Sequence, residues 1–126
     1  MNIQLVCVDK IDSVWPRIKG QILRALAECD DLKLSEMYSF CRSGRGFLFV
    51  SDDLNASLIL GFENRNGFEV ARVYAMGADA NADWKQVFQD IKKFAQANGA
   101  EKIVFQGRKG WAKIFGIEPK YYHYEV

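Results

Sequence analysis

One stretch of the chain, residues 68–107, constrains the fold more than any other. Residues 68–76 (FEVARVYAM) are rich in β-branched and aromatic side chains, which favours a strand. Apolar residues then recur at helical spacing over residues 84–95, and residues 102–106 (KIVFQ) form a second apolar run. A strand, a helix and a second strand within about forty residues predict a βαβ unit, whose strands lie parallel and whose crossover is right-handed.

The turn that opens this helix is the first candidate binding site. The first N–H groups of a helix have no partner within it, and the helix dipole is positive at that end. The polar turn Gly77–Asn81 therefore predicts a place for an anionic ligand. Asp79 lies in this turn, where it either caps the helix, as Asn81 also could, or repels the anion.

The N-terminal half predicts a strand, two helices and an antiparallel meander. Ile3–Val8 is the first strand, Ser13 could cap the helix after it, and Ser35 starts a shorter helix. Asn66 and Gly67 tolerate positive φ and predict a tight hairpin turn. The meander consists of three extended stretches, Phe47–Val50, Ala56–Phe62 and Phe68–Met76.

A short helix around Trp111 and a last strand, Tyr121–Val126, complete the expected order β-α-α-β-β-β-α-β-α-β. This order predicts an α/β fold with a mixed sheet and helices on both faces. Residues 1–126 are expected to form a single domain, because the chain contains no repeat, linker or low-complexity tract. The three tryptophans, Trp15, Trp84 and Trp111, are expected to anchor the core.

Composition narrows the class of protein. Apolar residues make up 49% and charged residues 26% of the chain, which excludes a disordered protein. The net charge of +1 gives no global attraction to nucleic acid or to an anionic membrane. The apolar run Ile3–Val8 is too short for export or membrane insertion. Cys7, Cys29 and Cys41 lack metal-ligand spacing and are expected to be reduced, buried thiols of a cytoplasmic protein.

The element order resembles that of the GNAT superfamily, the Gcn5-related N-acetyltransferases. In that family the fourth strand and the next helix bind acyl-coenzyme A, with the pyrophosphate on the turn between them. The pantetheine lies where the fourth and fifth strands diverge. The resemblance implies acetyl-coenzyme A as cofactor, with contacts at Val73, Ala75, Gly77, Ala78, Asn81 and Ala82 and positive charge from Arg108.

Two short pieces also resemble GNAT-like proteins encoded by tailed phages and prophages: FAQANG, residues 94–99, and QGRKGWAK, residues 106–113. The chain departs from the family pattern in the turn, which usually reads Gln/Arg-x-x-Gly-x-Gly/Ala. Here the turn has one early glycine and no basic residue. Many members place a tyrosine four residues before the closing glycine of the last helix to protonate the leaving thiolate, and Ala112 stands at that position.

These features predict a phage- or prophage-type protein with a degenerate acyl-coenzyme A site. It would act as a non-catalytic accessory or virion-associated protein that contacts a phage or host protein. The alternative is an acetyl-coenzyme A-dependent N-acetyltransferase that acts on an unknown amine. Nucleic-acid binding through Arg108, Lys109 and Trp111 is a weaker hypothesis, because the net charge is only +1. These residues also suit a plain strand-to-helix turn. His123 is either a general base or a structural residue of the last strand.

Overall fold

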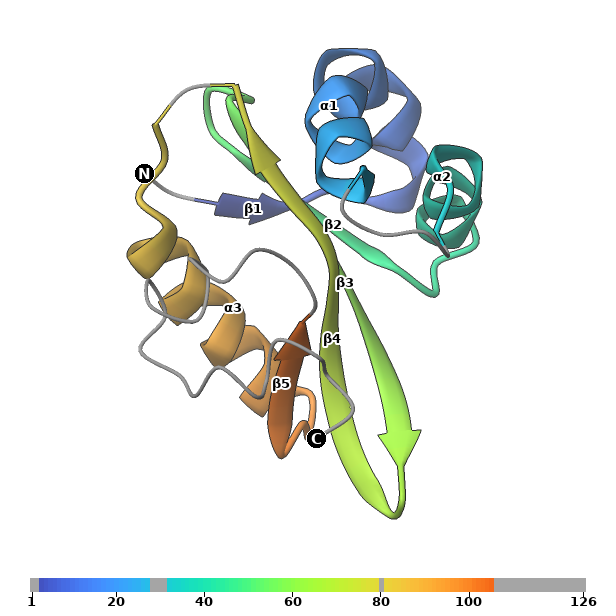
Figure 1. Ribbon diagram of the computed structural model, residues 1–126, viewed down its shortest axis with the longest axis vertical. Coiled ribbons are helices and arrows are strands. Elements are labelled where there is room, and N and C mark those ends of the chain that lie inside the picture. Colours follow the sequence, from blue (N-terminus) through green and yellow to red (C-terminus); the bar gives the residue numbers. More distant parts are fainter. Residues whose placement is uncertain (1–2, 28–31, 80, 106–126) are drawn as a thin grey trace.

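The computed structural model describes residues 3–27, 32–79 and 81–105, and these residues form a five-stranded sheet with helices on both sides (Figure 1). The expected elements around Trp111 and 121–126 lie outside this part, as do Cys29, Arg108 and His123. In chain order the elements are β1 (Ile3–Leu5), the 3-10 turn η1 (Val8–Lys10), α1 (Ile11–Leu26), α2 (Leu34–Arg42), β2 (Phe47–Ser51), β3 (Ala56–Arg65), β4 (Phe68–Ala78), α3 (Trp84–Ala97) and β5 (Lys102–Phe105).

The strands follow one another in the order β1-β2-β3-β4-β5. Neighbours from β1 to β4 are antiparallel, whereas β5 runs parallel to β4, with Val70 opposite Lys102 and Val73 opposite Phe105. The predicted βαβ unit is therefore confirmed. The hairpin between β3 and β4 turns at Asn66-Gly67, as predicted, with φ angles of 53° and 87°.

An extra residue in β4 interrupts the pairing with β3. Leu60 lies opposite Val73 and Ile59 lies opposite Ala75, so Tyr74 has no opposite residue and forms a β-bulge. The bulge changes the alternation of the strand. Tyr74 and Ala75 both pack towards α1 and α2, while residues on either side of them pack towards α3. The sequence pattern did not predict this change of direction.

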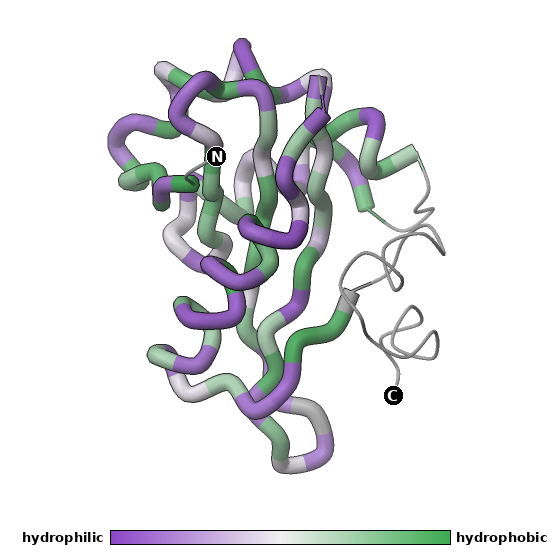
Figure 2. Tube along the Cα trace, turned by 90° about the vertical axis from the view of Figure 1, so that its left-hand side faces the viewer, coloured by the Kyte–Doolittle hydropathy of each residue, from purple (hydrophilic) through white to green (hydrophobic). Residues whose placement is uncertain are grey.

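The two faces of the sheet carry separate apolar cores. Helices α1 and α2 cover one face and α3 covers the other (Figure 1). In Figure 2 the strands carry mostly apolar residues, whereas the helices alternate between polar and apolar ones. On α3, Ile91 and Ala95 are each 1% exposed, and Phe94 packs beside them. The predicted buried face of this helix is confirmed.

Two expectations for the N-terminal segment are wrong. Helix α1 begins at Ile11, before Ser13, whose hydroxyl donates to the carbonyl of Lys10 at 2.7 Å from inside the first turn. β1 ends at Leu5 because the chain turns into η1, and this leaves Cys7 exposed instead of in the core. Cys41 is buried as expected, and burial raises the pKa of its thiol to about 12.

Within the described part of the chain, every helix is too short or too polar to cross a membrane. Three residues that were expected to anchor the core are buried to different degrees. Trp15 is 9% exposed and Cys41 is fully buried, whereas Trp84 is half-buried and packs against the core beneath α3.

The two faces of α3 predict opposite responses to alanine substitution. Ile91→Ala should lower the free energy of unfolding by about 2–5 kcal/mol, because it removes a buried branched side chain and leaves a cavity. Lys92→Ala, on the exposed side of the same helix, should change it by less than about 0.5 kcal/mol. Urea denaturation of both variants checks this, and equal effects would contradict the assigned face.

Candidate functional site at the end of β4

The last part of β4 has a described strand neighbour on one side only. Its pairing with β5 is described as far as Val73, whereas its pairing with β3 continues to Ala78. On the β3 side, the N–H of Asp79 donates to the carbonyl of Asn55 at 2.8 Å. Alternate residues of a strand direct their backbone groups to the same edge, so Met76 and Ala78 direct theirs away from β3. This edge is the candidate site.

Gly77 lies inside β4 and not in the predicted turn. It pairs with Ser57, and a Cβ added to it would lie 2.5 Å from the backbone oxygen of Gln21 in α1. The glycine is therefore required for the close packing of helix against strand. Gly77 and Ala78 both belong to the strand, so the connection to α3 begins only at Asp79.

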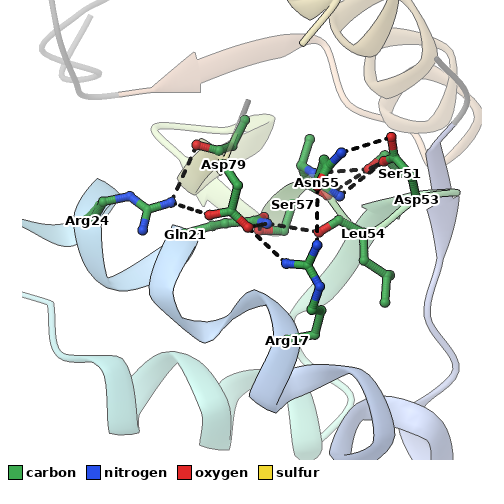
Figure 3. A network of polar contacts seen from close by, with 11 residues as sticks. Arg17, Gln21, Arg24, Ser51, Asp53, Leu54, Asn55, Ser57 and Asp79 are labelled. Atoms are coloured by element: carbon green, nitrogen blue, oxygen red, sulfur yellow. Dashed lines mark hydrogen bonds and ion pairs between the residues drawn. The ribbon is translucent and has the colours of Figure 1, made fainter. Parts of the chain in front are cut away.

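The carboxylate of Asp79 is directed towards α1 (Figure 3). It accepts hydrogen bonds from Arg17 Nη1 at 2.9 Å, from Gln21 Nε2 at 3.0 Å and from Arg24 Nη2 at 2.6 Å. These bonds lower the pKa of Asp79 to about 2, and the bond from Gln21 is the largest cause. The expectation that Asp79 caps the next helix or faces its anion site is wrong, because α1 supplies three donors that the turn lacks.

A second set of bonds fixes the donors of α1. Gln21 is 1% exposed, and its side chain also donates to the carbonyl of Leu54 at 2.9 Å and accepts from the hydroxyl of Ser57 at 2.6 Å. Arg17 Nη2 donates to the side-chain oxygen of Asn55 at 3.2 Å. These contacts connect α1, the turn between β2 and β3, and the end of β4 (Figure 3).

Asp53 stabilises the β2–β3 turn that holds these partners. Its carboxylate accepts hydrogen bonds from the hydroxyl of Ser51 at 2.7 Å and from the backbone N–H of Asn55 at 3.0 Å. The bond from Ser51 is the main cause that lowers the pKa of Asp53. The turn therefore has side-chain hydrogen bonds of its own that do not involve the carboxylate of Asp79.

Asp83 caps α3. Its side-chain Oδ1 accepts a hydrogen bond from the backbone N–H of Gln86 at 3.1 Å. An Asp at this position satisfies one of the free N–H groups and places a negative charge at the positive end of the helix dipole. The start of α3, where an anion was predicted to bind, is thus already beside the carboxylate of Asp83. The cap is neither Asp79 nor Asn81, as had been predicted.

The residues predicted to contact the cofactor lie along one strand end and the turn after it. Val73 and Ala75 are each 5% exposed and face opposite sides of the sheet, while Asn81 is exposed. Gly77, Ala78 and Ala82 are half-buried, and Arg108 lies outside the described residues. Among the residues described, no three His, Cys, Asp or Glu side chains lie close enough together to hold a metal ion.

The sequence analysis missed the three donors of α1. Arg17, Gln21 and Arg24 are spaced i, i+4 and i+7, so they share one face of the helix. This spacing was visible in the sequence. The spacing does not identify the acceptor, because Asp79 lies far away in the sequence, 62 residues from Arg17 and 55 from Arg24.

No protein-family model matches the chain, and no curated protein matches it either. Solved structures of acetyltransferases do match. A probable acetyltransferase is 12% identical, with a TM-score of 0.69, over 92% of this chain and 86% of its own. An aminoglycoside acetyltransferase from an uncultured soil metagenomic sample, in complex with sisomicin, is 14% identical, with a TM-score of 0.62, over 91% and 84%.

Glucosamine-6-phosphate N-acetyltransferase from Arabidopsis thaliana also matches, with 11% identity and a TM-score of 0.61 over 93% of this chain and 90% of its own. The chain therefore has the fold of the GNAT acetyltransferases. At these identities the similarity is one of fold, and a fold by itself does not carry an activity.

Two glycine substitutions test the contact between α1 and β4. Gly77→Ala should lower the free energy of unfolding by about 1–3 kcal/mol, because the new Cβ would collide with the backbone of Gln21. Gly20→Ala is the matched control inside α1, where a Cβ would meet only the end of Arg24 at 3.6 Å. It should stabilise by up to about 1 kcal/mol. Chemical denaturation measures both, and a neutral Gly77→Ala would contradict the contact.

The lowered pKa of Asp79 predicts how stability depends on pH. The folded-state pKa lies below the ordinary value of 3.8, so the stabilising contribution of Asp79 is complete above about pH 4 and is lost as the pH falls towards 2. Asp79→Asn lacks this titration. The melting temperature of the wild type should exceed that of Asp79→Asn at neutral pH, and the difference should shrink between pH 4 and 2. A difference that is constant over this range would contradict the ion pairs.

Proposed function

We propose that this chain is a GNAT-fold protein of the phage or prophage type with a degenerate acyl-coenzyme A site, and that it acts as a non-catalytic accessory protein. The observation that carries this proposal is the cap of α3, where the carboxylate of Asp83 accepts the N–H of Gln86 at 3.1 Å. One N–H donor of the helix start that would hold a pyrophosphate is thereby satisfied from within the chain.

A pyrophosphate needs several N–H donors that converge on it and a positive local charge. At α3 one of these donors is bonded to Asp83, whose own negative charge repels a phosphate. The turn contributes neither a glycine-rich backbone nor a basic side chain. The edge of β4 fits the extended amide chain of a pantetheine better than the turn fits a pyrophosphate. The site therefore suits the pantetheine half of acyl-coenzyme A and opposes its pyrophosphate half.

An accessory role requires a surface for a protein partner, of phage or host origin, in the cytoplasm or in a virion. Several large apolar side chains are exposed among the described residues and are candidate contact points for such a partner. Leu5 and Val8 are 46% and 42% exposed on the N-terminal edge, Leu23 is 55% exposed on α1, and Phe68 is 44% exposed at the hairpin. The resemblance of residues 106–113 to short phage proteins supports the same role.

The second candidate is an acetyl-coenzyme A-dependent N-acetyltransferase that acts on an amine. The observation in its favour is the fold, which the chain shares with acetyltransferases over about nine-tenths of its length. Val73, Ala75, Gly77, Ala78, Asn81 and Ala82, with Arg108, would then lie along the cofactor. The cofactor would supply the activated acetyl group, and the edge of β4 beyond the bulge would orient its amides.

Calorimetric titration with acetyl-coenzyme A separates the two candidates. The wild type should bind no ligand at about 1 mM, and it should release no coenzyme A from acetyl-coenzyme A with a panel of amines. A dissociation constant in the low micromolar range, about −7 kcal/mol, would refute the degenerate site and favour the acetyltransferase.

Two variants, one at the cap of α3 and one within the helix, test whether Asp83 prevents the binding of acetyl-coenzyme A. Asp83→Gly removes the carboxylate and frees the N–H of Gln86, so weak binding gained in this variant would identify Asp83 as the obstacle. Lys92→Ala, on the exposed side of the same helix, is the control and should behave as the wild type. Circular dichroism should confirm that α3 remains helical in both.

A further inference from the structure

Three side-chain donors of α1 converge on a single oxyanion. Arg17 and Gln21 both donate to Oδ2 of Asp79, at 2.9 and 3.0 Å, and Arg24 donates to Oδ1 at 2.6 Å. Their spacing of i, i+4 and i+7 puts them on one face of the helix. Guanidinium groups and amides with such geometry are the donors that proteins use for carboxylate and phosphate oxygens.

Each of the three donors also has a hydrogen bond that does not involve the side chain of Asp79. For Arg24 this bond runs from Nη2 to the carbonyl of Ala78 at 3.4 Å. Gln21 is 1% exposed, and its amide is oriented by the carbonyl of Leu54 and the hydroxyl of Ser57. Arg17 is bonded through its other terminal nitrogen to the side chain of Asn55. Removal of the Asp79 carboxylate would therefore leave a preformed group of donors and not a collapsed one.

The charge and exposure of this group favour an external ligand. Two guanidinium groups face one carboxylate, so the group keeps a net charge of +1 with Asp79 in place. The side chains of Arg17, Arg24 and Asp79 are 49%, 58% and 35% exposed, so solvent reaches the site. A phosphate group carries more negative charge and one more oxygen than a carboxylate, and it matches two arginines better.

We propose that Arg17, Gln21 and Arg24 form an oxyanion site for a phosphate-type group, and that Asp79 is its tethered internal occupant. The site lies on α1, separate from the start of α3, and it does not depend on acyl-coenzyme A. An incoming phosphate must displace Asp79, which attaches the end of β4 to α1. Occupation of the site would thus release the turn between β4 and α3.

A tethered carboxylate competes at a high effective concentration, so free phosphate should bind weakly to the wild type. Asp79→Ala removes the competitor. At about 100 mM inorganic phosphate, compared with chloride at the same ionic strength, the melting temperature of Asp79→Ala should rise by about 3–6 °C. The wild type and the double variant Asp79→Ala/Arg24→Ala should rise by much less.

Equal responses of Asp79→Ala and the double variant would overturn the proposal, as would the absence of any response beyond that to chloride. A parallel measurement in acetate tests whether the site prefers phosphate to a carboxylate. Phosphate should raise the melting temperature of Asp79→Ala more than acetate does, and the reverse order would refute the phosphate preference. If Asp79→Ala does not fold in chloride, Asp79→Asn takes its place in the same comparison. Failure of acetyl-coenzyme A to bind the wild type leaves this result unaffected.

Discussion

The close packing of α1 on the end of β4 is the contact on which the rest of the structure depends. It is possible only because Gly77 has no side chain, since a Cβ there would lie 2.5 Å from the backbone of Gln21. This approach buries the amide of Gln21, and a buried amide needs hydrogen-bond partners. Leu54, Ser57 and Asp79 supply them. One missing side chain thus fixes the helix, the β2–β3 turn and the end of the strand together.

The bulge at Tyr74 makes this contact compatible with a regular sheet. It turns Tyr74 and Ala75 to the same face, so a strand that pairs regularly with β5 at one end can present Gly77 to α1 at the other. Tyr74 remains anchored there. Its hydroxyl donates to Glu63 at 2.7 Å, and burial is the main cause that raises its pKa to about 12. The backbone groups of Met76 and Ala78 lie on the edge of β4 that faces away from β3.

The sequence predicted what local patterns encode and missed what distant contacts decide. The βαβ unit, the Asn66-Gly67 turn and the buried face of α3 each follow from spacing within a few residues. The bulge did not, because tyrosine and alanine suit either face of a strand. The predicted caps of α3 were Asp79 and Asn81, whereas the residue that caps the helix is Asp83. Only the fold reveals that α1 engages Asp79 and leaves Asp83 for the helix.

Asp79 and Asp83 determine which hydrogen-bond donors of the candidate site are already bonded within the chain. A helix start or a cluster of arginines can be satisfied by the chain itself or by a ligand, but one set of donors does not serve both at once. Asp83 accepts one N–H of the start of α3, and Asp79 pairs with Arg17 and Arg24. Both groups of donors are therefore already bonded to a carboxylate of the chain. A ligand that binds either group of donors must therefore first break a hydrogen bond within the chain.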